Sequence, residues 1–257
     1  MDATQIVLMS VLERKHWWYR ATHELVSSCI LKFIGRDKTI FDAGCGTGGL
    51  LRRLAALGAV HGCDANSLSV RLARKKARAE YRERIYEHPI EAIHEYEHRR
   101  FDCLTCIDVL YHKNVKNWRS ALGDLTRILK PDGHLILQVP AFSALHGSHD
   151  AAVHGERRFR RSEIEAALQT HGMKPLIITY RLSHLFPFML IRRLASRIMT
   201  RGAFQSDFED MQQYAEWTKE LCDGTALHFA RLENRLLMQG VRVPFGSSLF
   251  AVARSIQ

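Results

Sequence analysis

The feature that most constrains this chain is a glycine-rich turn between an apolar segment and a helical one. Apolar residues 39–43 lead into the turn, which reads Asp42-Ala43-Gly44-Cys45-Gly46-Thr47-Gly48, and residues 49–57 read as a helix. Glycines allow the tight bend and let a ligand approach the backbone closely. The start of the helix presents free N–H groups to that ligand. The pattern predicts an α/β sheet with a ligand site at the end of its first strand.

An acidic residue follows the turn at an informative spacing. The next apolar segment, residues 60–63, leads into Asp64, 22 residues after Asp42. A carboxylate at the end of a second strand can accept hydrogen bonds from both hydroxyls of a ribose. Asp42, just before the turn, would repel a pyrophosphate and attract a positively charged amine. We therefore expect the ligand of this turn to be a nucleoside that carries a positive charge.

Strand-like and helix-like segments alternate along most of the chain. The predicted strands are residues 39–43, 60–63, 85–87, 101–107, 135–139, 176–180 and 249–253. The predicted helices are residues 3–13, 19–33, 49–57, 66–79, 118–129, 162–172, 183–200 and 207–239. Asn66 is expected to cap one of these helices, and Ser162 with Glu165 to form a capping box on another. The alternation predicts a doubly wound, Rossmann-like sheet of seven mostly parallel strands.

Three regions follow from this pattern. Residues 36–182 and 241–257 are expected to form the core. Residues 183–240, which interrupt the alternation before the last strand, are expected to form a helical cap over the substrate; the alternative is that they only pad one face of the sheet. Residues 1–35 form an N-terminal helical segment with an aromatic and basic cluster, His16-Trp17-Trp18-Tyr19-Arg20.

Composition indicates the cellular compartment of the protein and the charge of its partners. The chain has 257 residues, six cysteines and a formal net charge of +10. Several cysteines, among them Cys103 and Cys106, fall in predicted strands, so we expect free buried thiols in a reducing, cytoplasmic setting. No signal peptide and no membrane span is expected. The basic charge favours acidic partners. No nucleic-acid partner is expected, and nucleic acid stays an alternative.

The motifs together resemble those of the class I S-adenosylmethionine-dependent methyltransferases. The resemblance rests on the D-x-G-x-G-T-G turn, on Asp64, and on Phe101-Asp102-Cys103-Leu104 through Asp108-Val109-Leu110 at the fourth predicted strand. It also rests on Leu129-Lys130-Pro131-Asp132-Gly133-His134-Leu135 before the fifth predicted strand. The His16–Arg20 cluster and Val243-Pro244-Phe245-Gly246-Ser247-Ser248 look like the two ends of a bacterial subgroup. This chain departs from the subgroup at Tyr111-His112, where Glu-His is common, and at Asp132-Gly133, where two glycines are common.

The resemblance implies S-adenosylmethionine as cofactor and an N-terminal segment that folds over it. The residues expected to bind the cofactor are Trp18, Tyr19, Arg20, Asp42, Gly44, Cys45, Gly46, Asp64, Ala65, Asp108 and Val109.

Several histidines are expected near the methyl group, on the loops after the fourth and fifth strands. A histidine of near-neutral pKa can remove a proton from the acceptor. The candidate catalytic residues are His112 or His149 as the base, Asp150 as its orienting partner, and Tyr111. His146, His154 and Arg158 are expected to bind substrate. A metal held by His146, His149, Asp150 and His154 is a minor alternative, and no metal is expected.

The sequence therefore predicts a methyltransferase that modifies a small molecule. Oxygen and nitrogen are the expected acceptor atoms, and the acceptor is a secondary metabolite or a carrier-linked intermediate, anionic or apolar. The alternatives are a nucleic-acid methyltransferase and a non-catalytic cofactor-binding partner in a heteromeric complex. The oligomeric state stays open, with a dimer among the options.

Overall fold

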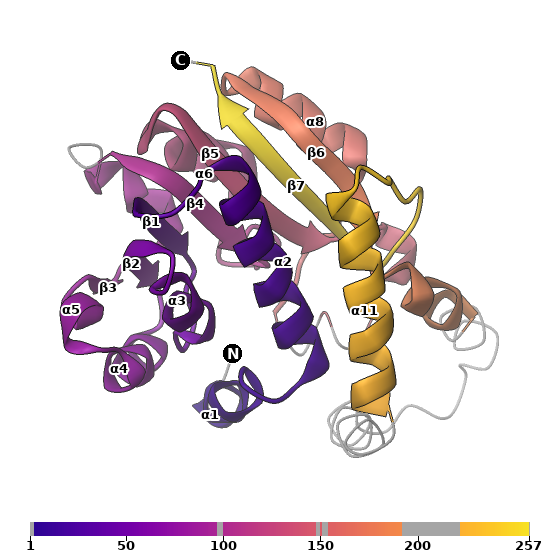
Figure 1. Ribbon diagram of the computed structural model, residues 1–257, viewed down its shortest axis with the longest axis horizontal. Helices are drawn as coiled ribbons and strands as arrows, with labels where there is room; N and C mark the ends of the chain where they lie inside the picture. Colours follow the sequence, from indigo (N-terminus) through magenta and orange to yellow (C-terminus); the bar gives the residue numbers. More distant parts are fainter. Residues whose placement is uncertain (1–2, 97–99, 148–149, 151–153, 192–221, 257) are drawn as a thin grey trace.

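Seven strands form one sheet in the order β3-β2-β1-β4-β5-β7-β6 (Figure 1). The computed structural model describes residues 3–96, 100–147, 150, 154–191 and 222–256. β7 pairs antiparallel with both β5 and β6, and the other pairings are parallel. The predicted seven-stranded, mostly parallel sheet is confirmed.

The elements of the sheet and its helices lie close to their predicted positions. The strands are β1 (Lys38–Ala43), β2 (Gly58–Asp64), β3 (Ile85–Glu87), β4 (Phe101–Ile107), β5 (Leu129–Pro140), β6 (Met173–Arg181) and β7 (Ser248–Ser255). The α-helices are α1 (Ala3–Leu12), α2 (Trp17–Phe33), α3 (Gly49–Leu54), α4 (Ser67–Lys76), α5 (Ala79–Arg82), α6 (Trp118–Arg127), α8 (Arg161–Thr170) and α11 (Cys222–Met238). Short 3₁₀ helices are η1 (Ile90–Tyr96), η2 (Ser143–Leu145) and η3 (Ser183–Leu185).

Helices cover both faces of the sheet, as a doubly wound fold requires. On one face, side chains of η1, α6 and α8 pack with the strands into one buried cluster. On the other face, α2, α3, α4 and α11 contribute to a second cluster, and Figure 1 shows α2 and α11 side by side in front of the sheet. Because parallel strands inside the sheet are covered on both faces, residues 40–43 of β1 are all buried, and β4 is buried and mostly apolar.

The cysteines confirm this packing. Cys103 and Cys106 both lie on β4, but Cys103 packs in the α2 face cluster and Cys106 in the α6 face cluster. Residues three apart on a strand point to opposite faces, so these two thiols do not form a redox pair. Cys29, Cys45, Cys63, Cys103 and Cys106 are all free and buried.

Two local predictions were wrong. α8 begins at Arg161, so Ser162 is not its N-cap residue; the N-cap is Arg160, and the Glu163 carboxylate accepts the Arg160 backbone N–H at 2.8 Å. β5 begins at Leu129, before the predicted start at residue 135. The register between β5 and β4 shifts: Phe101 pairs with Leu129, but Cys103 pairs with His134. Residues 130–133 therefore form an irregularity inside β5 and not a turn before it.

The described part of the predicted cap lies against the core. α11 packs beside α2, and the Glu233 carboxylate accepts the backbone N–H groups of Leu182 and Ser183 at 2.6 and 2.9 Å. Residues 192–221, the middle of the predicted cap, lie outside the described residues. None of the described helices is long and apolar enough to cross a bilayer.

Candidate functional site

The glycine turn lies where β1 ends, at the carboxyl edge of the parallel strands. Gly44, Gly46 and Gly48 have φ values of +76°, +54° and +86°, which side chains other than glycine rarely adopt. The backbone N–H groups of Gly44 and the next residue both donate to the Cys63 carbonyl oxygen at 2.8 Å. A Cβ on Gly44 would lie 2.3 Å from a Val109 methyl group. The turn is therefore locked between β2 and the segment after β4.

Two predicted carboxylates flank this turn. Asp42 is 2% exposed, and the Thr105 hydroxyl donates to it at 2.6 Å. Burial raises the pKa of Asp42 to about 7. Asp64, at the end of β2, accepts the backbone N–H of Gly46 at 3.0 Å and that of Asn66 at 2.9 Å. Burial also raises the pKa of Asp64.

A third carboxylate at the turn was missed by the sequence reasoning. Glu13, just after α1, is 7% exposed, and the Thr47 hydroxyl donates to it at 2.6 Å. The Lys76 ammonium of α4 donates to Glu13 at 3.3 Å, to Thr47 at 3.0 Å and to the Ser10 carbonyl at 3.0 Å. A Cβ on Gly49 would lie 2.8 Å from the Glu13 carboxyl carbon. No motif or period in the sequence links residue 13 to the turn, so only the folded chain reveals it.

The three carboxylates give the turn an acidic electrostatic character. Glu13 and Asp64 both add to the raised pKa of Asp42, after burial as the main cause. Such a site repels phosphates and attracts cations. It fits a nucleoside with a positively charged amino-acid tail and does not fit a pyrophosphate.

The His16–Arg20 cluster lies at the start of α2, and its side chains differ in burial. Trp17 is 3% exposed and packs with α11, while Arg20 is exposed. The rings of Trp18 and Tyr19 meet edge to face at 4.9 Å. Burial, with the charges of Glu13 and Asp108, raises the pKa of the Tyr19 hydroxyl. Trp18, Tyr19 and Arg20 were predicted to bind the cofactor, and of these Tyr19 interacts electrostatically with the carboxylates of the site.

Asp108, after β4, is the last member of a series of hydrogen-bonded polar side chains. Its φ is +52°, and the Gln138 amide nitrogen donates to its carboxylate at 2.9 Å. The Gln138 oxygen accepts from Arg181 at 2.6 Å, and Arg181 also donates to Thr22 and Asn234. Burial raises the pKa of Asp108 to about 6, and Gln138 and Arg181 oppose the rise. The sequence did not predict the roles of Gln138 and Arg181. They lie on separate strands, and no local pattern shows that their side chains bind each other.

Tyr111 and His112 follow Asp108 and pack against the loop after β5. Gly155 lies against the Tyr111 ring, where a Cβ would approach to 2.8 Å. The rings of His112 and His154 are 5.8 Å apart. Burial, with the neighbouring His154, lowers the pKa of His112 to about 4, so this ring is neutral at pH 7. Its Nδ1 accepts the Asn114 backbone N–H at 3.3 Å, a long hydrogen bond that uses the single lone pair of the neutral ring.

Asp150 and Arg158 bind each other. The Arg158 guanidinium holds both carboxylate oxygens of Asp150, at 2.9 and 3.2 Å, and donates to the Ala141 carbonyl oxygen at 3.0 Å. Asp150 also accepts the backbone N–H of Gly147 at 2.8 Å. Both side chains are buried, and their contacts join Asp150 to Gly147 and Arg158 to Ala141. His149, the other predicted base, lies outside the described residues.

The remaining predicted residues take varied positions. Cys45 is buried within the turn, Ala65 is exposed just after β2, and His146 is exposed on the loop after β5. Within the described ranges, no group of three or more His, Cys, Asp or Glu side chains could hold a metal ion.

Comparison with known proteins identifies the segment that carries the turn. Residues 40–133 match the family model described as "Methyltransferase domain". A curated relative, the ubiquinone biosynthesis O-methyltransferase of Alkalilimnicola ehrlichii, is 34% identical over 115 residues, which is 44% of this chain and 45% of the relative. The matched region thus spans less than half the length of that relative.

Solved structures share the whole fold at low identity. A Haloferax volcanii chain solved with the Trm112 methyltransferase activator has a TM-score of 0.60 at 15% identity, over 99% of this chain and 95% of that one. The [4+2]-cyclase SpnF has a TM-score of 0.57 at 18% identity, over 93% of this chain and 83% of that one. The likeness confirms the fold alone, and a cyclase among the neighbours shows that this fold does not decide the reaction.

Proposed function

We propose, from the premise that residues 40–133 form a methyltransferase domain on a class I fold, that this chain transfers a methyl group from S-adenosylmethionine to a small molecule. The observation that carries the proposal is the glycine turn with buried carboxylates on both sides. It matches the charge and shape of this cofactor, which has a ribose, a cationic amine and a sulfonium.

The residues around the turn have separate tasks in this proposal. Asp64 accepts hydrogen bonds from the ribose hydroxyls, and Asp42 attracts the ammonium group, while the backbone of Gly44 and Gly46 lies against the amino-acid tail. When bound, the cofactor supplies an electrophilic methyl carbon. Residues 1–35 close over it, with Glu13 on the turn and Tyr19 near Asp108. The chain then has to orient the acceptor and exclude water.

The acceptor atom is oxygen in this proposal. The curated relative named above is an O-methyltransferase, and it is 34% identical to this chain over 115 residues, which supports this choice. A hydroxyl acceptor must lose a proton, and we assign that task to His112 or His149. Two features of His112 oppose this role: its pKa is lowered to about 4 and not near neutral, and the lone pair at Nδ1 has to leave the Asn114 N–H before it can accept a proton.

The cofactor assignment predicts a specific calorimetric result. We expect S-adenosylmethionine and S-adenosylhomocysteine to bind the wild type, and Asp64→Ala to weaken both by about 2 kcal/mol, because hydrogen bonds to a charged group are lost. Asp132→Ala, which removes a carboxylate that is 78% exposed, is the matched control and should bind like the wild type. Binding of NAD, or of neither adenosyl compound, would refute the proposal.

The base assignment is tested by turnover of a panel of phenols. Loss of the general base should lower kcat by about 10²- to 10⁴-fold without changing the affinity for S-adenosylmethionine. His112→Gln and His149→Gln are measured separately, so that the two candidates are distinguished. If both variants keep wild-type kcat, the base is not a histidine of these two loops.

A further inference from the structure

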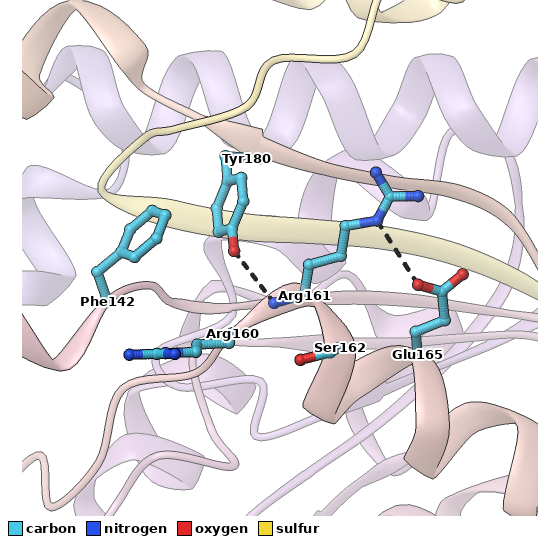
Figure 2. Close-up of a pocket in the computed structure, with 6 residues that line it drawn as sticks. All are labelled: Phe142, Arg160, Arg161, Ser162, Glu165 and Tyr180. Carbon is cyan, nitrogen blue, oxygen red and sulfur yellow. Dashed lines mark hydrogen bonds and ion pairs between the residues drawn. The ribbon is translucent and has the colours of Figure 1, made fainter.

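A pocket of about 460 Å³ opens beside the ends of β5 and β6, away from the glycine turn (Figure 2). It is lined by Phe142, Arg160, Arg161, Ser162, Glu165 and Tyr180. These residues come from the segment after β5, the start of α8 and the end of β6. The pocket thus lies at the same carboxyl edge of the sheet as Asp108, on the side of β5, β7 and β6.

Two aromatic rings form one wall of the pocket. Phe142 and Tyr180 stack with ring centroids 4.5 Å apart and an interplanar angle of 23°. Phe142 has a φ of +56°, a left-handed conformation that costs a bulky residue about 1–3 kcal/mol. Its backbone N–H donates to the Phe159 carbonyl at 3.1 Å, which holds it there. The ring is half-buried: it packs against the core and meets the Phe186 ring edge to face at 5.4 Å, and its remaining surface lines the pocket.

The opposite wall is cationic and polar. Figure 2 shows the Arg160 side chain directed toward the side on which Phe142 lies, with the Ser162 hydroxyl on the same wall. The Arg161 backbone N–H donates to the Tyr180 hydroxyl at 3.2 Å and so joins the two walls. The Arg161 guanidinium is 3.6 Å from Glu165, but both side chains are well exposed, so this pair is weak. An incoming anion can compete with it.

We propose that this pocket binds a planar aromatic molecule that carries a carboxylate or a phosphate. The ring of the ligand stacks on Phe142, because offset aromatic pairs are favourable beyond their buried area. The anion lies on Arg160 and Arg161, since guanidinium groups bind carboxylates and phosphates through paired N–H donors. The pocket serves to anchor the anionic part of the methyl acceptor. That role rests on the proposed function, whereas the binding itself does not.

The test is a titration of the full chain, saturated with S-adenosylhomocysteine, with phenyl phosphate and with benzoate. We expect both to bind, and phenol and inorganic phosphate to bind at least about tenfold more weakly, because each offers half of the contacts. Arg160→Gln should weaken phenyl phosphate about tenfold and Phe142→Leu several-fold. Arg127→Gln is the matched control. Like Arg160, Arg127 is an exposed arginine, but it lies on α6, outside the residues that line the pocket, and its loss should change nothing.

The outcomes separate this inference from the proposed function. Unchanged binding in Arg160→Gln, an equal loss in Arg127→Gln, or inorganic phosphate as tight as phenyl phosphate would each overturn it. Competition between S-adenosylhomocysteine and phenyl phosphate would also overturn it, since the probe would then occupy the glycine turn. If neither adenosyl compound binds but phenyl phosphate binds the free chain and depends on Arg160, the methyl-transfer proposal fails and the binding site stands.

Discussion

At the scale of single residues, burial changes the chemistry of Asp42. Its carboxyl group is almost fully buried and has the Thr105 hydroxyl as its hydrogen-bond donor, and the pKa rises to about 7. The native state therefore keeps a proton that the unfolded chain loses above pH 4. Folding binds this proton between pH 4 and 7, so the contribution of Asp42 to stability falls as the pH rises through that window.

Replacing Asp42 with asparagine tests this titration. Asp42→Asn keeps an acceptor for Thr105 but cannot ionise. We expect its free energy of unfolding, relative to the wild type, to rise by about 2–3 kcal/mol between pH 5 and pH 7.5, measured by urea denaturation. Over the same range its deficit in S-adenosylmethionine affinity should grow, because only the ionised wild type attracts the ammonium group. A difference in stability that is independent of pH would show that Asp42 does not titrate in this window.

At the scale of elements, the N-terminal helix is fastened to the cofactor turn by polar contacts. Lys76 on α4 reaches the Ser10 carbonyl, Glu13 and Thr47, and so joins α1 to the turn and to α4. Exposed Arg14 and Lys15 follow directly and lead into α2. The contacts of Lys76, the Thr47–Glu13 hydrogen bond and the buried Ile6 side chain hold this segment, so local opening is expected to cost less free energy than global unfolding.

Removing this lysine should loosen the N-terminal segment. We expect Lys76→Met to raise the rate of trypsin cleavage after Arg14 and Lys15 about tenfold, which corresponds to the loss of roughly 1.4 kcal/mol from the opening free energy. S-adenosylmethionine should slow cleavage in the wild type. Lys75→Met removes an exposed neighbouring lysine and serves as the control. Equal cleavage rates in the two variants would mean that Lys76 does not hold α1 on the turn.

At the scale of the whole molecule, charge is unevenly distributed. The chain carries a formal net charge of +10, yet Glu13, Asp42, Asp64 and Asp108 gather at the carboxyl edge of the sheet. An acidic edge opposes the phosphate backbone of nucleic acid and suits a cationic cofactor. The positive charge lies on the surface, in part at Arg160 and Arg161 beside the aromatic pocket.

One buried cation also joins the layers of the molecule. Arg181 is fully buried at the end of β6 and donates to Gln138 on β5, Thr22 on α2 and Asn234 on α11. Its Nη2 has no hydrogen-bond partner in the part of the chain that the structure describes. Because the Gln138 oxygen faces Arg181, its amide nitrogen must face Asp108. Arg181 of β6, which contacts α2 and α11 through Thr22 and Asn234, thereby sets which hydrogen bond the Asp108 carboxylate receives.

The local sequence determined the order of strands and helices, the glycine turn and the two acids on either side of it. These features depend on short-range physics. Apolar residues alternate or recur within one element, glycines mark the left-handed positions of the turn, and Asn66 caps its own helix, where its side chain accepts the Ser69 N–H at 3.0 Å. They could therefore be predicted without knowledge of the fold.

Only the tertiary structure decided which side chains share the site. Glu13 meets Thr47 and Lys76, and Arg181 reaches Gln138, across long stretches of sequence with no periodic signal. Asp150 and Arg158, predicted for separate roles, bind each other instead. Such pairings depend on how the sheet and its two helical layers bring distant residues together, because a buried charge must find its hydrogen-bond partners wherever the fold places them.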